Sequence, residues 1–155
     1  MEIYEFSIKK KIFFDKLKSV LSKAFRVPES KIGTSTKFYD SYESLADFEL
    51  GIEVENQDSG FSTFIKCASK KDLTENDIFN IACTLSVLLT SEVAIGDITY
   101  DSDISTGDFL VITPDKFVYR AYEDADLIEN EDIFELKARS RKISITDFVK
   151  KFIES

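Results

Sequence analysis

The chain has 155 residues, of which 43% are hydrophobic and 32% charged, so its length fits one domain and its composition is globular rather than disordered. The formal net charge of −9 disfavours nucleic acid and anionic membranes as partners, since both carry negative charge, and it suits a cationic partner. The absence of histidine excludes Ser–His and Cys–His catalysis and histidine metal sites.

The N-terminus predicts no targeting segment, because Met1–Glu5 contains acids and lacks an apolar stretch. No apolar run approaches the roughly 18 residues that a membrane-spanning helix needs. Cys67 and Cys83 are expected to be two reduced, packed thiols, because free cysteine is among the most buried residue types. Together these features favour a cytoplasmic protein.

The first helix is predicted over residues 8–25, after a short strand over residues 2–6. Ser7 is expected to cap this helix, because its hydroxyl can accept a hydrogen bond from a free backbone N–H of the first turn. Apolar residues follow at helical spacing: Ile8, Ile12, Phe13, Leu17, Val20, Leu21 and Ala24. We interpret this stripe as the core face of the helix.

The other face of this helix is basic, with lysines seven residues apart at Lys9, Lys16 and Lys23. We interpret these lysines as a solvated face. Asp15 is expected to pair with Lys11 and Lys18 across single turns. A membrane-surface or partner helix is the alternative interpretation.

A β-hairpin is predicted in the next part of the chain, after a loop over residues 29–44. Apolar and acidic residues alternate over residues 48–55, which is typical of a strand with one buried face. A turn cluster over residues 56–60 precedes a returning strand over residues 61–68.

A second helix is predicted over residues 75–90, and its start resembles a capping box with Thr74 as the cap and Asp77 in place of the usual Glu or Gln. This segment is the most apolar of the chain. We therefore expect it to be the central packing element.

The second half of the chain is predicted to be mostly strands, over residues 93–99, 108–113, 116–122 and 133–136, with an acidic loop over residues 123–132. Pro114 presets a tight turn between the second and third of these strands. Ser144 is expected to cap a last short helix. This grouping predicts an α+β fold: one domain, with a mainly antiparallel sheet of about five strands and three helices packed on it.

Known chemical motifs are missing from the sequence. Neither GxxxxGK[ST] nor GxGxxG occurs. The stretch from Asp101 to Asp108 resembles a calcium loop, but its Gly107 is one residue late and Ile112 occupies the twelfth position in place of Glu. A solvated acidic turn is favoured, and a weak cation site stays the alternative. We expect no catalytic residue and no cofactor.

Charge is concentrated in residues 97–135, which hold twelve acidic and two basic residues, whereas the rest of the chain holds 17 acidic and 18 basic residues. This segment is either a clustered solubility surface or a docking face for a positively charged protein. The candidate partner-binding residues are Asp101, Asp103, Asp108, Tyr122, Glu123, Asp124, Asp126, Glu129, Glu131 and Asp132.

Residues 74–155 resemble the small immunity proteins of bacterial polymorphic-toxin and contact-dependent growth inhibition systems. The resemblance rests on the apolar helix over residues 77–89, the acidic turn and the strand pair over residues 109–119. The ending over residues 144–153 is similar to the terminal helix of the SUKH superfamily, although the N-terminal half lacks that superfamily's Leu-Pro and Asn-Gly features. The resemblance implies a toxin inhibitor whose cognate toxin is a basic nuclease.

Two other functions stay open on the sequence alone. Carboxylate pairs could serve a hydrolase, with or without a divalent cation, and a rise in melting temperature with Ca²⁺, Mg²⁺ or Mn²⁺ would favour it. The chain could also be a non-catalytic adaptor that binds a peptide or assembles with itself, which sizing chromatography at several concentrations would test.

Overall fold

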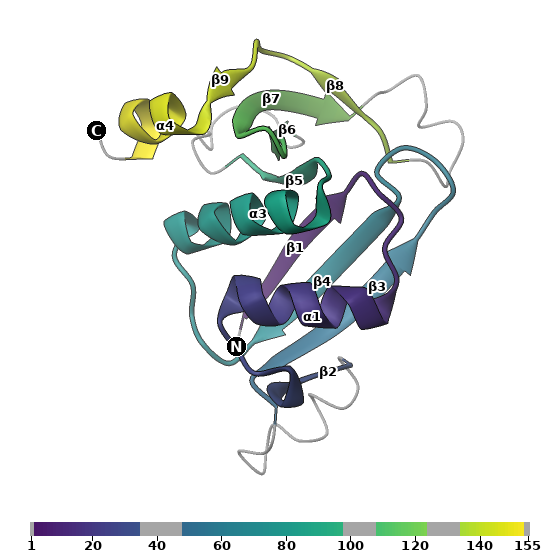
Figure 1. Cartoon of the computed structure of the whole chain (residues 1–155). Coiled ribbons are helices and arrows are strands. Elements are labelled where there is room, and N and C mark those ends of the chain that lie inside the picture. Colours follow the sequence, from purple (N-terminus) through teal and green to yellow (C-terminus); the bar gives the residue numbers. More distant parts are fainter. Residues whose placement is uncertain (1, 35–47, 98–107, 124–133, 154–155) are drawn as a thin grey trace.

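Three helices lie on one face of a curled, mostly antiparallel sheet (Figure 1). The computed structural model describes residues 2–34, 48–97, 108–123 and 134–153. Its strands are β1 (Glu2–Ile8), β2 (Ile32–Thr34), β3 (Leu50–Asn56), β4 (Thr63–Ser69), β5 (Val93–Gly96), β6 (Asp108–Ile112), β7 (Phe117–Glu123), β8 (Leu136–Ala138) and β9 (Ile143–Ser144). Its helices are α1 (Phe14–Phe25), the short 3-10 helix η1 (Glu29–Lys31), α3 (Glu75–Leu89), α4 (Ile145–Phe148) and the π-helix η3 (Val149–Ile153).

The strand order is β2-β3-β4-β1-β5-β6-β7-β8, with β9 also pairing with β7. Only the pairing of β2 with β3 is parallel among the described strands. The α+β class and the mainly antiparallel sheet are confirmed. The prediction of about five strands is wrong, because the described sheet has nine. The sequence predicted no strand at β2 or β9, which have only three and two residues, too few for an alternation of apolar and polar residues to be recognised.

The start of the first helix differs from the prediction. Ser7 is a buried residue of β1, paired with Phe64 and Ala94, and α1 begins only at Phe14. Phe6 and Ile8 point into the core on either side of Ser7, so the period here is two rather than 3.6. The backbone N–H and C=O groups of this segment form hydrogen bonds with neighbouring strands, so the segment is a strand rather than a helix.

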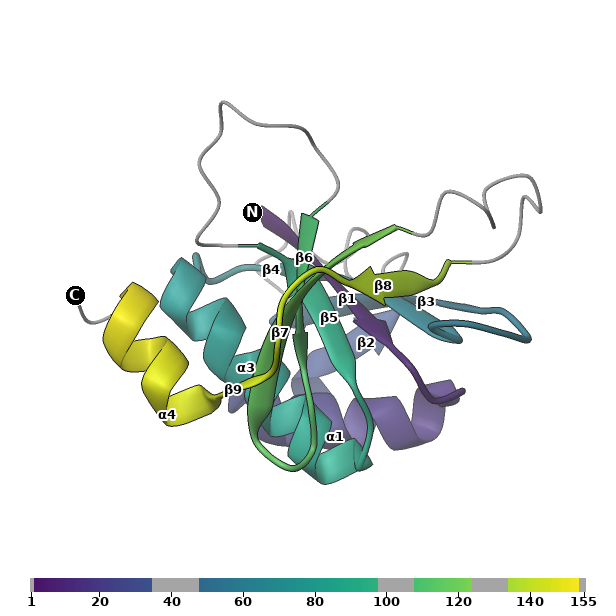
Figure 2. The ribbon, with the colours of Figure 1, turned by 90° about the horizontal axis from the view of Figure 1, so that it is seen from above.

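The second helix is confirmed as the central helix. Thr74 Oγ1 accepts from the Asp77 N–H at 3.1 Å, and the Asp77 carboxylate accepts from the Thr74 N–H at 2.9 Å, which completes a capping box. Helix α3 lies between α1 and α4 (Figure 2). Phe79 of α3 stacks on Phe148 of α4 with ring centroids 5.3 Å apart.

Two further local predictions are confirmed. The β6–β7 hairpin turns through Thr113 to Lys116, where Lys116 takes a left-handed φ of 68°. Ser144 caps α4 through a 3.1 Å hydrogen bond that its Oγ accepts from the Asp147 N–H.

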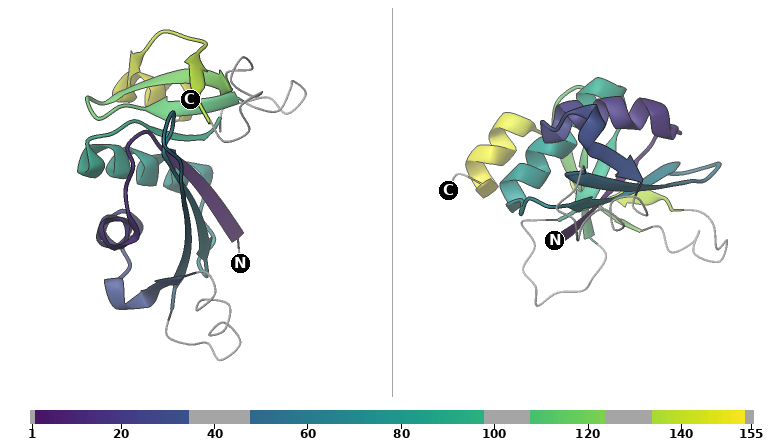
Figure 3. Two further views of the ribbon diagram at one scale, coloured as in Figure 1. Left: turned by 90° about the vertical axis from the view of Figure 1, so that its right-hand side faces the viewer. Right: turned by 90° about the horizontal axis from the view of Figure 1, so that it is seen from below.

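The main core fills the space between the sheet and the helices, which cover one face of it (Figure 3). A second, smaller cluster of Phe61, Ala94, Val111 and Ala121 lies apart from it and is packed by Tyr119, Phe134 and Leu136. The alternation along β5, β6 and β7 places this cluster on the sheet face opposite the helices.

Both cysteines are free, as expected, with Cys67 buried and Cys83 partly buried. Burial raises the pKa of the Cys67 thiol far above its ordinary value and that of Cys83 to about 12. Among the described residues, no helix is long and apolar enough to cross a membrane.

Candidate functional site

Four strand ends meet at one end of the sheet, which we call the acidic end. They are the end of β5, the start of β6, the end of β7 and the start of β8, marked by Asp97, Asp108, Glu123 and Leu136. The Asp97 N–H donates to the Asp108 carbonyl oxygen at 3.2 Å, which joins the first two. The residues that flank the stretches 98–107 and 124–133 are therefore all at this end.

By sequence, these two stretches carry seven acidic residues and no basic one: Asp101, Asp103, Asp124, Asp126, Glu129, Glu131 and Asp132. All seven were predicted as partner-binding residues, and all seven lie outside the described residues. Of the ten predicted residues, the structure describes Asp108, Tyr122 and Glu123, and the register of β6, β7 and β8 brings these three together.

Asp108 has an internal partner. Its carboxylate accepts from Arg139 Nη1 at 2.7 Å, and its side chain is only 7% exposed. The guanidinium of Arg139 also lies over the Tyr122 ring, 5.3 Å from the centroid. Asp108 and Tyr122 therefore form the base of the acidic end, whereas Glu123 is exposed to solvent.

A second ion pair stands beside the first. Arg120 Nε donates to Asp97 Oδ2 at 3.0 Å, and the Asp97 side chain is 1% exposed. The guanidinium of Arg120 packs 4.6 Å from the ring centroid of Phe152 in η3. This stacking joins the base of the acidic end to the C-terminal helical segment.

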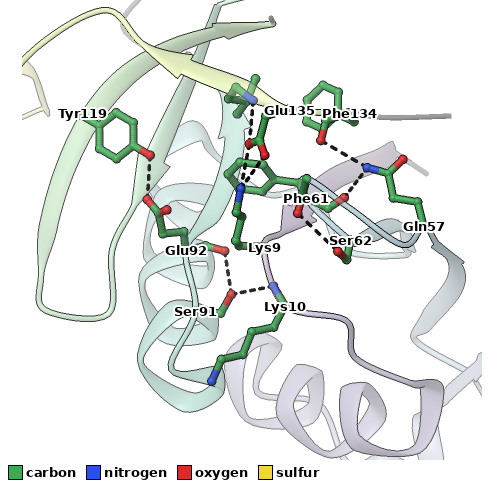
Figure 4. Close-up of polar contacts among 12 residues, drawn as sticks. Lys9, Lys10, Gln57, Phe61, Ser62, Ser91, Glu92, Tyr119, Phe134 and Glu135 are labelled. Atoms are coloured by element: carbon green, nitrogen blue, oxygen red, sulfur yellow. Dashed lines mark hydrogen bonds and ion pairs between the residues drawn. The ribbon is translucent and has the colours of Figure 1, made fainter. Parts of the chain in front are cut away.

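Phe134 and Glu135, just before β8, form hydrogen bonds with residues from distant parts of the chain (Figure 4). Glu135 accepts from Lys9 Nζ at 2.7 and 2.9 Å. The carbonyl oxygen of Phe134 accepts from the Phe61 N–H at 2.8 Å and from Gln57 Nε2 at 3.2 Å. Gly60 permits this approach, because its φ is 67° and a Cβ there would lie 2.3 Å from the Phe134 oxygen.

A further polar contact joins β7 to the residue just before β5. Tyr119 Oη donates to Glu92 Oε2 at 2.7 Å (Figure 4). Burial of the phenol raises the pKa of Tyr119 above its ordinary value, and the hydrogen bond to Glu92 and the charge of Glu135 raise it further. A protonated phenol at neutral pH serves here as a structural hydrogen-bond donor.

The sequence did not identify the cations that neutralise Asp97, Asp108 and Glu135. Arg120 comes from β7, but Lys9 and Arg139 come from outside residues 97–135. Pairs so distant in the chain follow from the strand order, and no local pattern predicts them. The formal charge of the acidic segment therefore overstates the negative charge that it presents to a partner.

Within the described ranges, no group of three or more His, Cys, Asp or Glu side chains is placed to hold a metal ion. The calcium-like stretch lies outside those ranges except for Asp108, whose carboxylate is paired with Arg139. Comparison of the chain with family models, curated proteins and solved structures finds no match.

Proposed function

We propose that this protein is a non-catalytic inhibitor, an immunity protein that binds and neutralises a cognate, basic, nuclease-type bacterial toxin in the cytoplasm of the cell that makes it. The observation that carries the proposal is the register of β5 to β8. It brings the residues that flank both acidic stretches to one end of one sheet, and by sequence the two stretches between those flanks carry seven acids.

The packing beneath the acidic end supports this role. The two buried carboxylates, Asp97 and Asp108, are neutralised by arginines, and Glu135 is fastened to Lys9. These pairs fix the strand ends without using Glu123, which stays exposed. A rigid base with exposed charge is suited to fast, electrostatically steered association with a cationic surface.

The test starts from the reading frame upstream of this gene, which the proposal expects to encode the toxin domain. Co-expression of that domain with this protein should rescue growth. The purified pair should bind tightly, with an association rate that falls steeply as salt is added. Failure to rescue growth, or an association rate independent of salt, would contradict the proposal.

A charge-matched comparison locates the surface. The triple variant Glu123→Gln, Asp124→Asn, Asp126→Asn should slow association with the toxin domain. The control removes the same number of acids from the exposed β3–β4 hairpin, as Glu53→Gln, Glu55→Gln, Asp58→Asn. Equal slowing by both variants would show that net charge, rather than the acidic end, drives the encounter.

A further inference from the structure

The outer surface of α1 and of the end of α3 has the opposite character to the acidic end. Residues 9–26 contain seven basic residues and a single acid, Asp15. The sequence predicted that Asp15 pairs with Lys11 and Lys18. That prediction is wrong, because Lys11 pairs with Asp58 at 2.9 Å and, within the described residues, Asp15 forms no ion pair with Lys18.

Three cations follow one another along the exposed side of α1. Lys16, Lys23 and the C-cap residue Arg26 are exposed, and none of them makes an ion pair with a residue of the described chain. Their spacing of seven and three residues places them along one side of the helix. They form a line of unneutralised positive charge parallel to the helix axis.

Exposed apolar side chains gather on the same surface. Phe13, just before α1, is 66% exposed, and Val87 and Leu88 near the end of α3 are 47% and 40% exposed. They are three of the five large hydrophobic side chains exposed in the described ranges.

The packing of the helices sets the direction of these side chains. Helix α3 has α1 and α4 on its two sides (Figure 2), and Val87 and Leu88 are exposed on its remaining, outer side. Lys10, in the segment between β1 and α1, contacts the end of α3, since its Nζ donates to the Leu89 carbonyl oxygen at 3.4 Å.

We propose that this basic–apolar surface, defined by Phe13, Lys16, Lys23, Arg26, Val87 and Leu88, docks on an anionic lipid bilayer. Lysine and arginine heads suit anionic headgroups, and the exposed rings and branched chains suit the boundary between headgroups and acyl chains. The apolar side chains favour a bilayer over a purely polar polyanion, which has nothing to bury them.

The net charge of −9 does not oppose this contact at short range. Charges beyond about 8 Å are largely screened at physiological ionic strength, so the local basic surface determines the interaction once contact is made. The acidic end belongs to β5–β8, whereas α1 lies in the other half of the molecule (Figure 1). The molecule would therefore bind with α1 towards the membrane and the acidic end away from it.

The test is sedimentation of the full chain with lipid vesicles. Vesicles of phosphatidylcholine and phosphatidylserine should pull the protein down, and vesicles of phosphatidylcholine alone should not. Lys16→Gln/Lys23→Gln should weaken binding about fivefold for each lysine, because a lysine near such a surface contributes about 1 kcal/mol. Phe13→Ser should weaken it as well. Arg141→Gln/Lys150→Gln, which removes the same charge from exposed positions elsewhere, should leave binding unchanged.

Three outcomes would overturn the proposal. The first is no binding to vesicles that contain phosphatidylserine. The second is an equal loss of binding in the Arg141→Gln/Lys150→Gln control. The third is binding to heparin that depends on Lys16 and Lys23 but not on Phe13, with no binding to vesicles, which would assign the surface to a soluble polyanion. None of these results bears on the toxin test, which uses the other end of the molecule.

Discussion

Replacing Arg139 by Met tests whether the ion pair at the base of the acidic end stabilises the fold. The substitution keeps an apolar chain of similar length over Tyr122 but leaves the Asp108 carboxylate, which is only 7% exposed, without its cation. Losing one partner of a fully buried pair costs about 3–5 kcal/mol, and an exposed pair contributes about 0–1 kcal/mol. Because Arg139 itself is 49% exposed, water can reach the vacated position, and we expect a loss of about 2 kcal/mol.

That loss corresponds to a fall in melting temperature of about 4–8 °C for a chain of this size. Urea unfolding followed by circular dichroism measures it, with tyrosine fluorescence as a second probe because the chain has no tryptophan. The double variant Asp108→Asn/Arg139→Met should recover at least half of the loss, because it removes the unpaired buried charge. The control Arg141→Met should stay within about 0.5 kcal/mol of the wild type. An unfolding free energy of Arg139→Met that matches this control would refute the reasoning.

The remaining predictions concern the other described contacts. Gly60→Ala should lower the unfolding free energy by about 2 kcal/mol or more, measured by urea titration, because it adds left-handed strain and a clash with a backbone carbonyl. The raised pKa of Tyr119 makes the folded state retain its proton longer than the unfolded state, so stability should fall as pH rises above about 10. Tyr119→Phe should flatten that alkaline fall, and an unchanged slope would contradict the assignment. Cys67 and Cys83 should resist a thiol reagent at pH 8 in the native protein and react on unfolding; rapid native labelling of Cys67 would contradict its burial.

The sequence predicted the elements whose determinants are local. The capping box at Thr74 and the cap at Ser144 depend on residues three apart in the chain, and both are present. The turn at Pro114 is likewise set by its own residues. The prediction of a helix from Ile8 onward is wrong at its start, because apolar residues at every second and at every fourth position coincide over so short a stretch.

The candidate site could be predicted only in part. The concentration of acids was visible in the sequence. The sequence did not show which carboxylates pair with cations inside the protein, as Asp97 and Asp108 do, and which are exposed, as Glu123 is. Asp108 was predicted as a partner-binding residue, and the sequence did not predict that its carboxylate pairs with Arg139, thirty-one positions along the chain. Only the pairing of β6, β7 and β8 places these two residues together, and strand order across a sheet depends on packing over the whole domain rather than on neighbouring residues.

The position of β1 has a consequence for how the chain folds. This first strand lies inside the sheet, where Ile8 pairs with Thr63 of β4 and with Val93 of β5. The backbone N–H and C=O groups on both edges of β1 can pair only after β4 and β5 have formed. The long loops between these strands must therefore close before the middle of the sheet can form. High contact order of this kind slows folding. During synthesis the apolar side chains of Phe6 and Ile8 stay exposed until the later strands have been made. Incomplete, newly made chains should therefore be the species most prone to aggregate.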